Sequence, residues 1–195
     1  MHVAERLAAA VQDLLADVPE GDAFRSGWPD LRATRPQVPG QLPVCAVLPT
    51  LADHTAPQTA ALVAAVIDAA PMLEWRQTYG PEDFGPAFLK GYGWTELIGL
   101  RGPIPGTTLA MGFLLLGPGI AYPPHAHEAS ELYLPLAGTA LWQQGGADFT
   151  AVPPGRAILH APWVPHATTT TGQGVLALYL WRGGDLAAKS RIVGR

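Results

Sequence analysis

The sequence predicts an all-β protein, a closed antiparallel double sheet of the jelly-roll type with an N-terminal α-helical extension. The chain has 195 residues, which fits one domain with room for such an extension. Its 22 glycines and 20 prolines are spread between short apolar runs, so they are interpreted as turns between strands. Eight such runs follow one another from residue 94 onward, and this number of strands is typical of a jelly roll.

Two helices are expected before the sheet. Residues 3–17 carry apolar side chains at nearly helical spacing. After a proline-rich connector, Thr55 and Gln58 have the spacing of a capping box, which predicts the start of a second helix. This helix is expected to run to about Ala70, where a proline ends it.

A loop and a barrel follow the helices. Residues 74–93 mix aromatic residues with glycine and proline, and they are expected to fold over another part of the molecule. The chain is accordingly divided into a helical extension with its covering loop, residues 1–93, and a β-barrel with a metal site, residues 94–195. The expected strands are 94–100, 108–116, 131–136, 139–144, 149–152, 156–159, 166–171 and 175–181.

Charge and cysteine content exclude several classes of protein. The net charge of −4 provides no basic surface for nucleic acid. The N-terminus has no signal-peptide pattern, and no apolar run is long enough to cross a bilayer, so a cytoplasmic protein without membrane contact is expected. The low charged fraction, 14%, is consistent with a buried subunit contact and leaves a homodimer open. The single cysteine excludes an intramolecular disulfide.

The most informative stretch, residues 119–138, contains a group of potential metal ligands. Successive side chains of a strand alternate between faces, so His125 and His127 project to the same side. Glu131 and Tyr133 have the same parity and join them if the strand resumes in phase. Two neutral imidazoles and a carboxylate on one side form a transition-metal site with open positions.

A further ligand is expected from the second half of the chain. A Val-Pro-His sequence at the head of a strand is expected to deliver His166 into the barrel interior. His160 is expected to lie behind the ligands or at the surface, and it remains an alternative ligand. The expected cofactor is one divalent transition metal ion, Fe²⁺, Zn²⁺ or Mn²⁺, and the donor set does not choose between them.

The spacing of these residues resembles a known family. Gly119, the two histidines, Glu131 and Gly138 reproduce the first motif of the cupin superfamily, whereas the second motif is matched more loosely. Residues 92–185, and most strongly residues 119–142, look like the bacterial cupin-type dimethylsulfoniopropionate lyases. The resemblance implies a cupin barrel and cleavage of this sulfonium carboxylate to dimethyl sulfide and acrylate by β-elimination.

The resemblance also implies roles for individual residues. A bound metal would act as a Lewis acid on the substrate carboxylate, and Tyr133 or Tyr122 would be the base and contact the substrate. A phenol is a poor base at neutral pH, and an adjacent cation would lower its pKa. The sulfonium group has no hydrogen-bond donor, so aromatic faces are its natural receptor. Candidates are Trp94, Trp142, Tyr179 and above all Trp181, with Tyr92 and Trp163 as further choices, while Glu96 and Arg182 are charged neighbours of undecided role.

Two other functions use the same ligands. One is a different cupin reaction, such as an oxygenase or isomerase acting on a small carboxylate or sugar. The other is a non-catalytic metal-binding sensor. The pair of tyrosines favours base-catalysed elimination over an oxygenase, and the N-terminal residues contain no basic helix that would serve a sensor.

Overall fold

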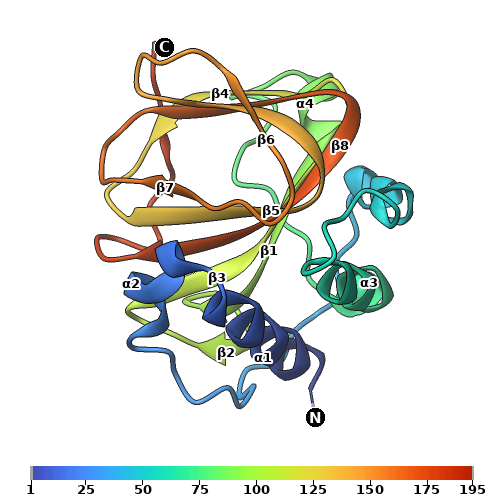
Figure 1. The fold of residues 1–195 in the computed structure, drawn as a ribbon, viewed down its shortest axis with the longest axis vertical. Coiled ribbons are helices and arrows are strands. Elements are labelled where there is room, and N and C mark those ends of the chain that lie inside the picture. The colour runs from blue at the N-terminus through green and yellow to red at the C-terminus, as the bar shows by residue number, and fades with distance from the viewer. Residues whose placement is uncertain (1, 195) are drawn as a thin grey trace.

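The computed structural model describes residues 2–194 as a β-barrel with helices packed against one side (Figure 1). The helices are α1 (Val3–Ala16), α2 (Asp22–Arg25), α3 (Ala60–Ala69) and α4 (Pro86–Lys90), with 3₁₀ turns at Pro19–Gly21, Pro43–Leu51 and Ala70–Met72. The strands are β1 (Tyr92–Gly99), β2 (Ile104–Pro105), β3 (Leu109–Leu116), β4 (Ala121–Ala126), β5 (Ser130–Gln144), β6 (Thr150–Val152), β7 (Ile158–His160), β8 (His166–Arg182) and β9 (Arg191–Ile192). The predicted all-β barrel with a helical extension is confirmed.

The first residues of α1 and α3 differ in how they are capped. His2 caps α1, because its ring accepts the Ala4 N–H while Glu5 accepts the His2 N–H. The predicted capping box of the second helix is wrong, because Thr55 forms a β-bridge with Ala137 of β5 and α3 begins only at Ala60. Among the helices of residues 2–194, none is long and apolar enough to span a membrane.

Two long strands organise the barrel. β5 has 15 residues and β8 has 17, and they pair along most of their length. The C-terminal half of β8 lies between β5 and β3, and its N-terminal half lies between β5 and β4. The sheet continues from β3 to β1 and then to the short β2, which is the one parallel neighbour among the described strands.

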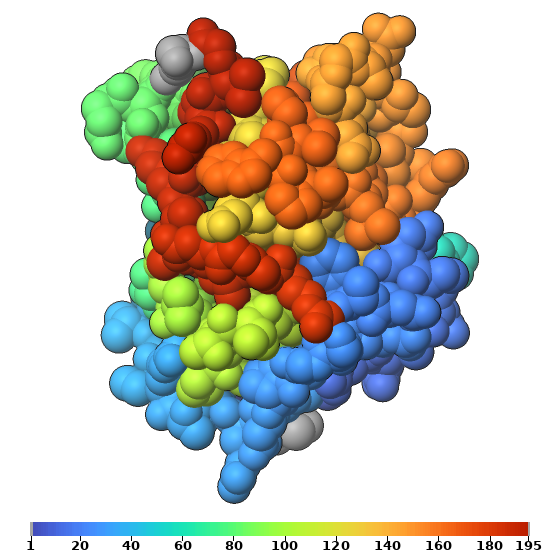
Figure 2. Space-filling model, turned by 90° about the vertical axis from the view of Figure 1, so that its left-hand side faces the viewer, coloured from blue at the N-terminus to red at the C-terminus, as the bar shows by residue number. Residues whose placement is uncertain are grey.

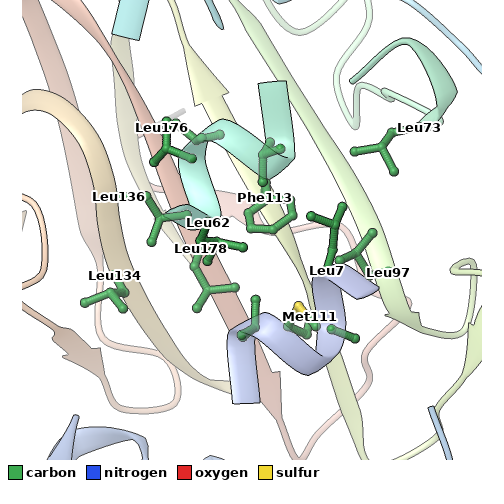
Figure 3. Packing of buried hydrophobic residues seen from close by; sticks show 14 of the residues in the cluster. Leu7, Leu62, Leu73, Leu97, Met111, Phe113, Leu134, Leu136, Leu176 and Leu178 are labelled. Atoms are coloured by element: carbon green, nitrogen blue, oxygen red, sulfur yellow. The ribbon is translucent and has the colours of Figure 1, made fainter. Parts of the chain in front are cut away.

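The outer face of this sheet packs against the helices. Its buried side chains are almost all aliphatic, and they form one core with the apolar faces of α1 and α3 (Figure 3). The labelled members of this core are Leu7, Leu62, Leu73, Leu97, Met111, Phe113, Leu134, Leu136, Leu176 and Leu178. The alternate residues of the same strands face the barrel interior, where the candidate site lies.

Candidate metal centre and adjoining cavity

Three histidines of the barrel interior share one hydrogen-bonding pattern, in which Nδ1 contacts a main-chain oxygen. The Nδ1 atoms of His125, His127 and His166 lie 2.9, 3.0 and 2.9 Å from the main-chain oxygens of Pro123, Ala129 and Val164. A carbonyl oxygen can only accept, so each Nδ1 carries the hydrogen and donates it. In the neutral imidazole, Nε2 is then left with a lone pair available for a metal ion.

Glu131 lies at the point where two of these lone pairs converge. Its Oε2 is 3.0 Å from Nε2 of His127 and 3.0 Å from Nε2 of His166, and all three side chains are buried. The three ligand atoms lie within 4.8 Å of one another. Acceptors facing an acceptor repel unless a cation or a proton lies between them, so this donor set fits a divalent transition metal ion.

The charges of this cluster depend on one another. Burial by itself raises the pKa of Glu131, but the His127 and His166 imidazoles outweigh it and hold that pKa well below its ordinary range. For His166, burial lowers the pKa, and the attraction of the protonated ring to the Glu131 carboxylate more than compensates, so the net shift is upward. Glu131 is therefore a carboxylate that requires positive charge beside it.

Trp181 orients the Glu131 carboxylate. The register of β5 and β8 places Glu131 directly opposite Trp181, whose indole Nε1–H donates to Oε1 at 2.6 Å. Its ring also packs on the His127 ring, with centroids 4.0 Å apart. One carboxylate oxygen is thus held by the indole while the other faces the histidines, an arrangement of the kind that positions metal ligands.

His125 and His160 flank the cluster. His125 lies outside the group of three, with its ring stacked on Tyr122 at 4.1 Å and 4.2 Å from the His166 ring. Burial, and then His166, lower the pKa of His125 to about 3. The predicted position of His160 behind the ligands agrees with its ring, which is buried and stacked on His166 at 4.0 Å. Neither His160 nitrogen has a hydrogen-bond partner among the described residues.

A cavity of about 600 Å³ extends from Glu131 to the edge of the barrel at β1. Its floor consists of side chains from the interior faces of β1, β3, β5 and β8. Residues 186–190, which follow β8, cover it together with residues 75–78. Figure 2 shows the C-terminal segment in red crossing this side of the molecule beside the yellow-green residues that follow β1. The Arg101 guanidinium joins the two segments by donating to the Ala187 carbonyl oxygen at 2.9 Å.

Both predicted catalytic tyrosines line this cavity. Tyr133 is two residues from Glu131 on the same face of β5; burial, and then the charge of Glu131, raise its pKa well above the ordinary value. Tyr122 belongs to β4, and its hydroxyl lies 3.1 Å from that of Tyr79. Burial, and then the neighbouring Tyr92, raise the pKa of Tyr122.

The other predicted substrate-binding residues have several positions. Trp94, Tyr92 and Tyr179 line the cavity beside the tyrosines. Trp142 does not line it and packs behind Tyr133, with ring centroids 5.0 Å apart. Trp163 is 48% exposed beneath the Arg191 guanidinium, and Arg182 donates to Ala23 and Ser26 near α2, so neither side chain takes part in the cavity.

Of the two covering segments, residues 75–78 belong to the loop that was predicted to fold over another part of the molecule, whereas sequence reasoning missed residues 186–190. Tyr79 lies in the aromatic loop predicted to fold over another part of the molecule, but its partner Tyr122 is set by long-range packing. Residues 186–190 carry no motif, and only their place after β8 brings them over the cavity.

Comparison with known proteins identifies the family of this chain. The dimethylsulfoniopropionate lyase family profile matches residues 29–177. The chain is 34% identical over 179 residues to dimethylsulfoniopropionate lyase DddQ of Ruegeria pomeroyi. The aligned region covers 92% of this chain and 89% of that protein.

Solved structures give the same result. The crystal structure of DddQ from Ruegeria pomeroyi superposes with a TM-score of 0.89 at 32% identity, covering 98% of this chain and 96% of that chain. A structure from a study of the DMSP lyases RdDddP and RnDddQII has a TM-score of 0.89 at 34% identity and covers 97% of both chains. A cupin-2 domain of Rhodospirillum rubrum, 16% identical with a TM-score of 0.50 over 63% of this chain and 76% of that chain, shares the fold alone. The chain therefore has a cupin fold and belongs to the dimethylsulfoniopropionate lyase family.

Proposed function

We propose that this protein is a metal-dependent carbon–sulfur lyase that cleaves dimethylsulfoniopropionate to dimethyl sulfide and acrylate. The observation that carries the proposal is the cluster of His127, Glu131 and His166, in which two unprotonated Nε2 atoms converge on one carboxylate oxygen at the end of the cavity. Family membership supports the choice of substrate, because the relatives are named as lyases of this compound.

The metal would be held by the three clustered residues, with His125 as the candidate fourth ligand. Fe²⁺, Zn²⁺ and Mn²⁺ all suit imidazole and carboxylate donors. When bound, such an ion would supply Lewis-acid stabilisation of negative charge on the substrate carboxylate. Trp181 would keep the Glu131 carboxylate in its orientation, because the indole N–H occupies the oxygen that faces away from the histidines.

The elimination requires a base beside the carbon next to the substrate carboxylate. The base removes a proton from that carbon, the released electron pair forms the carbon–carbon double bond, and the carbon–sulfur bond breaks with its electrons going to sulfur. The products are neutral dimethyl sulfide, acrylate and the protonated base.

Tyr133 is the proposed base. It lies two residues from the carboxylate of the cluster and lines the cavity, and its hydroxyl interacts with that carboxylate. Positive charge in the cluster would lower its pKa, opposite to the effect of the unneutralised Glu131 carboxylate. Tyr122, whose hydroxyl already faces Tyr79, is the alternative base and otherwise contacts the substrate.

Headspace gas chromatography for dimethyl sulfide tests the proposal. Metal-free protein is incubated with dimethylsulfoniopropionate, alone and after loading with Fe²⁺, Mn²⁺ or Zn²⁺. We expect metal-dependent release, lowered about 10²- to 10⁴-fold by Tyr133→Phe and less by Tyr122→Phe. Elemental analysis verifies that both variants hold as much metal as the wild type. Absence of release from protein that holds each ion would refute the proposal.

A further inference from the structure

Glu96 is a buried carboxylate in the wall of the cavity, on a different strand from the metal cluster. Only 5% of its surface is exposed, and it lines the cavity together with Glu131. Strand register places it in a row of four interior positions, in which Glu96 of β1 lies opposite Gly112 of β3, followed by Tyr179 of β8 and Tyr133 of β5. Glu96 and the proposed base are therefore at the two ends of one row across the cavity floor.

One oxygen of Glu96 has a structural role. Oε1 accepts the main-chain N–H groups of Arg101 at 2.6 Å and Gly102 at 2.8 Å, which anchors the loop after β1. Both of these hydrogen bonds use Oε1, and within residues 2–194 none is found for Oε2. One half of the carboxylate is thus fixed, and the other half is available to a ligand in the cavity.

No cation neutralises this carboxylate directly. No lysine, arginine or histidine among the described residues lies within ion-pair distance of Glu96. Of the two nearby arginines, Arg76 pairs with Glu74 at 2.7 Å, and the Arg101 guanidinium donates to the Ala187 carbonyl oxygen. The charges of Arg101 and Arg76 offset the burial of this carboxylate only in part, so its pKa stays raised, and a cationic ligand in the cavity would supply further positive charge.

The surroundings of Glu96 select the kind of cation. Trp94 precedes Glu96 by two residues on the same face of β1. Tyr179 lies two strands away in the same row, with Gly112 of β3 between it and Glu96. Gly112 has no side chain to separate Glu96 from Tyr179, and a Cβ atom there would overlap the Thr95 carbonyl oxygen. Aromatic faces around a single carboxylate suit a cation without hydrogen-bond donors, a sulfonium or a quaternary ammonium.

Tyr179 lies in the electrostatic field of both carboxylates. Burial, then the charge of Glu96 and, more weakly, that of Glu131, raise the pKa of Tyr179. Both carboxylates and this phenol line the same cavity, so a zwitterion bound there faces all three groups.

We infer that Glu96 is the specificity-determining residue for the cationic end of the substrate, with its free oxygen facing a sulfonium or quaternary ammonium group. The ligand class is short carboxylates that carry an onium group. This inference deepens the function proposed above and rests on it for the placement of the carboxylate at the metal cluster. Holding the sulfonium against Glu96 would align the carbon–sulfur bond with the base at the opposite end of the row.

A matched pair of non-reacting ligands isolates the charge. N,N,N-trimethyl-β-alanine carries the onium group, and 4,4-dimethylpentanoate replaces its nitrogen by carbon at nearly the same shape. Binding of each to the Zn²⁺-loaded protein is measured by titration calorimetry. We expect the wild type to bind the onium compound on the order of tenfold more tightly than the neutral one.

Glu96→Gln retains an oxygen that can accept both main-chain N–H groups and removes only the charge. It is expected to abolish the preference by weakening the onium compound, while the affinity for the neutral compound stays within about twofold. Glu74→Gln, which removes a carboxylate beside the cavity-lining Arg76, is the control and should keep the preference.

The outcomes separate this inference from the proposed function. Equal affinity of the wild type for the two ligands would overturn the role of Glu96, and this measurement does not depend on the folding of a variant. Equal weakening of both ligands in Glu96→Gln would also overturn it. Dimethyl sulfide release is measured on the same samples. If the protein prefers the onium compound through Glu96 but releases no dimethyl sulfide, the role of Glu96 in binding is supported and the proposed lyase function is refuted.

Discussion

The two faces of the sheet formed by β1, β3, β8 and β5 come from alternate residues of the same strands and have opposite chemistry. In β8, Leu176, Leu178 and Leu180 face the helices, whereas Tyr179 and Trp181 face the cavity. The outer face is aliphatic and close-packed (Figure 3), and the inner face contains two carboxylates, phenols and indoles. Stability and chemistry are thus separated by a shift of one residue along the chain.

This separation predicts that substitutions on the two faces affect different measurements. An inner-face change should alter metal binding or turnover and leave stability the same or higher, because buried polar groups are costly. An outer-face change should alter the free energy of unfolding and leave turnover per folded molecule unchanged. The following predictions test this comparison.

The largest expected effect is on the inner face. Glu131→Gln removes the charge that attracts a metal ion, while the amide N–H groups can donate to the Nε2 atoms of His127 and His166. We expect dimethyl sulfide release to fall at least on the order of 10²- to 10³-fold, with no loss of thermal stability in the metal-free state.

Glu128→Gln is the control for that variant. Glu128 lies three residues away, and within residues 2–194 it accepts the main-chain N–H of Asp185 alone, so its loss should leave metal content and release nearly unchanged. Full metal content and normal release in Glu131→Gln, measured by elemental analysis and headspace chromatography, would contradict the assignment of the cluster.

The next effect is on the outer face. Leu178 is fully buried between the sheet and the helices, and Leu178→Ala should lower the free energy of unfolding by about 2–5 kcal/mol. Urea denaturation measures this change, and turnover per folded molecule should stay within about twofold because no cavity residue is altered.

Leu159→Ala is the matched control on β7. This side chain is 44% exposed, so its truncation should change stability by no more than about 0.5 kcal/mol. Equal destabilisation by the two substitutions would show that the aliphatic face is not the main source of stability.

A smaller effect is expected from the indole that orients the metal ligand. Trp181→Phe keeps an aromatic ring on His127 and removes the N–H that Glu131 accepts, so metal affinity should fall about 10- to 100-fold. Trp142→Phe removes an indole N–H that has no partner among the described residues, so its effect on metal affinity should be much smaller. Competition with a fluorescent chelator measures both, and similar losses would contradict the orienting role.

The smallest effect concerns stability and pH. Burial raises the pKa of Glu96 despite the N–H donors of Arg101 and Gly102, so the folded state holds this proton more tightly than the unfolded state. Stability therefore falls as Glu96 ionises with rising pH, and a neutral glutamine avoids this cost.

Glu96→Gln should consequently melt at a higher temperature than the wild type at pH 7, and the difference should shrink toward about pH 4. Scanning calorimetry of both proteins across this range tests the sign. If the difference in melting temperature grew toward acidic pH, the ionised Glu96 carboxylate would not destabilise the folded state.

The sequence was sufficient to predict the barrel, but not the continuity of its strands. Residues 131–136 and 139–144 were expected to be separate, yet β5 runs through both, and Pro135 and Gly138 mark register shifts in place of a turn. The expected strands at residues 166–171 and 175–181 likewise join in β8. Proline and glycine inside a long strand favour bulges as well as turns, and local sequence does not distinguish them. β4 was absent from the expected strands and places His127 just beyond its end.

His127 and Glu131 could be predicted as neighbours because their spacing is local, whereas His166 comes from a separate strand, β8, and the roles of the surrounding residues depend on strand pairing. Glu131 and Trp181 are 50 residues apart, and only the pairing of β5 with β8 brings the indole to the carboxylate. The same holds for Glu96, whose place opposite Tyr133 depends on three strand pairings. The division of the chain at residue 93, the homodimer and the cytoplasmic location stay predictions.

The position of β8 has a consequence for how the molecule folds. This strand supplies His166 at its first residue and Trp181 next to its last, and it pairs with β3, β4 and β5. Such pairings between distant parts of the chain form late and slowly, because the intervening loops must close first. A refolding chain therefore has no high-affinity metal site until β8 is in place. The rate of metal uptake during refolding would thus report when β8 joins the sheet. The bound ion would then stabilise the completed barrel.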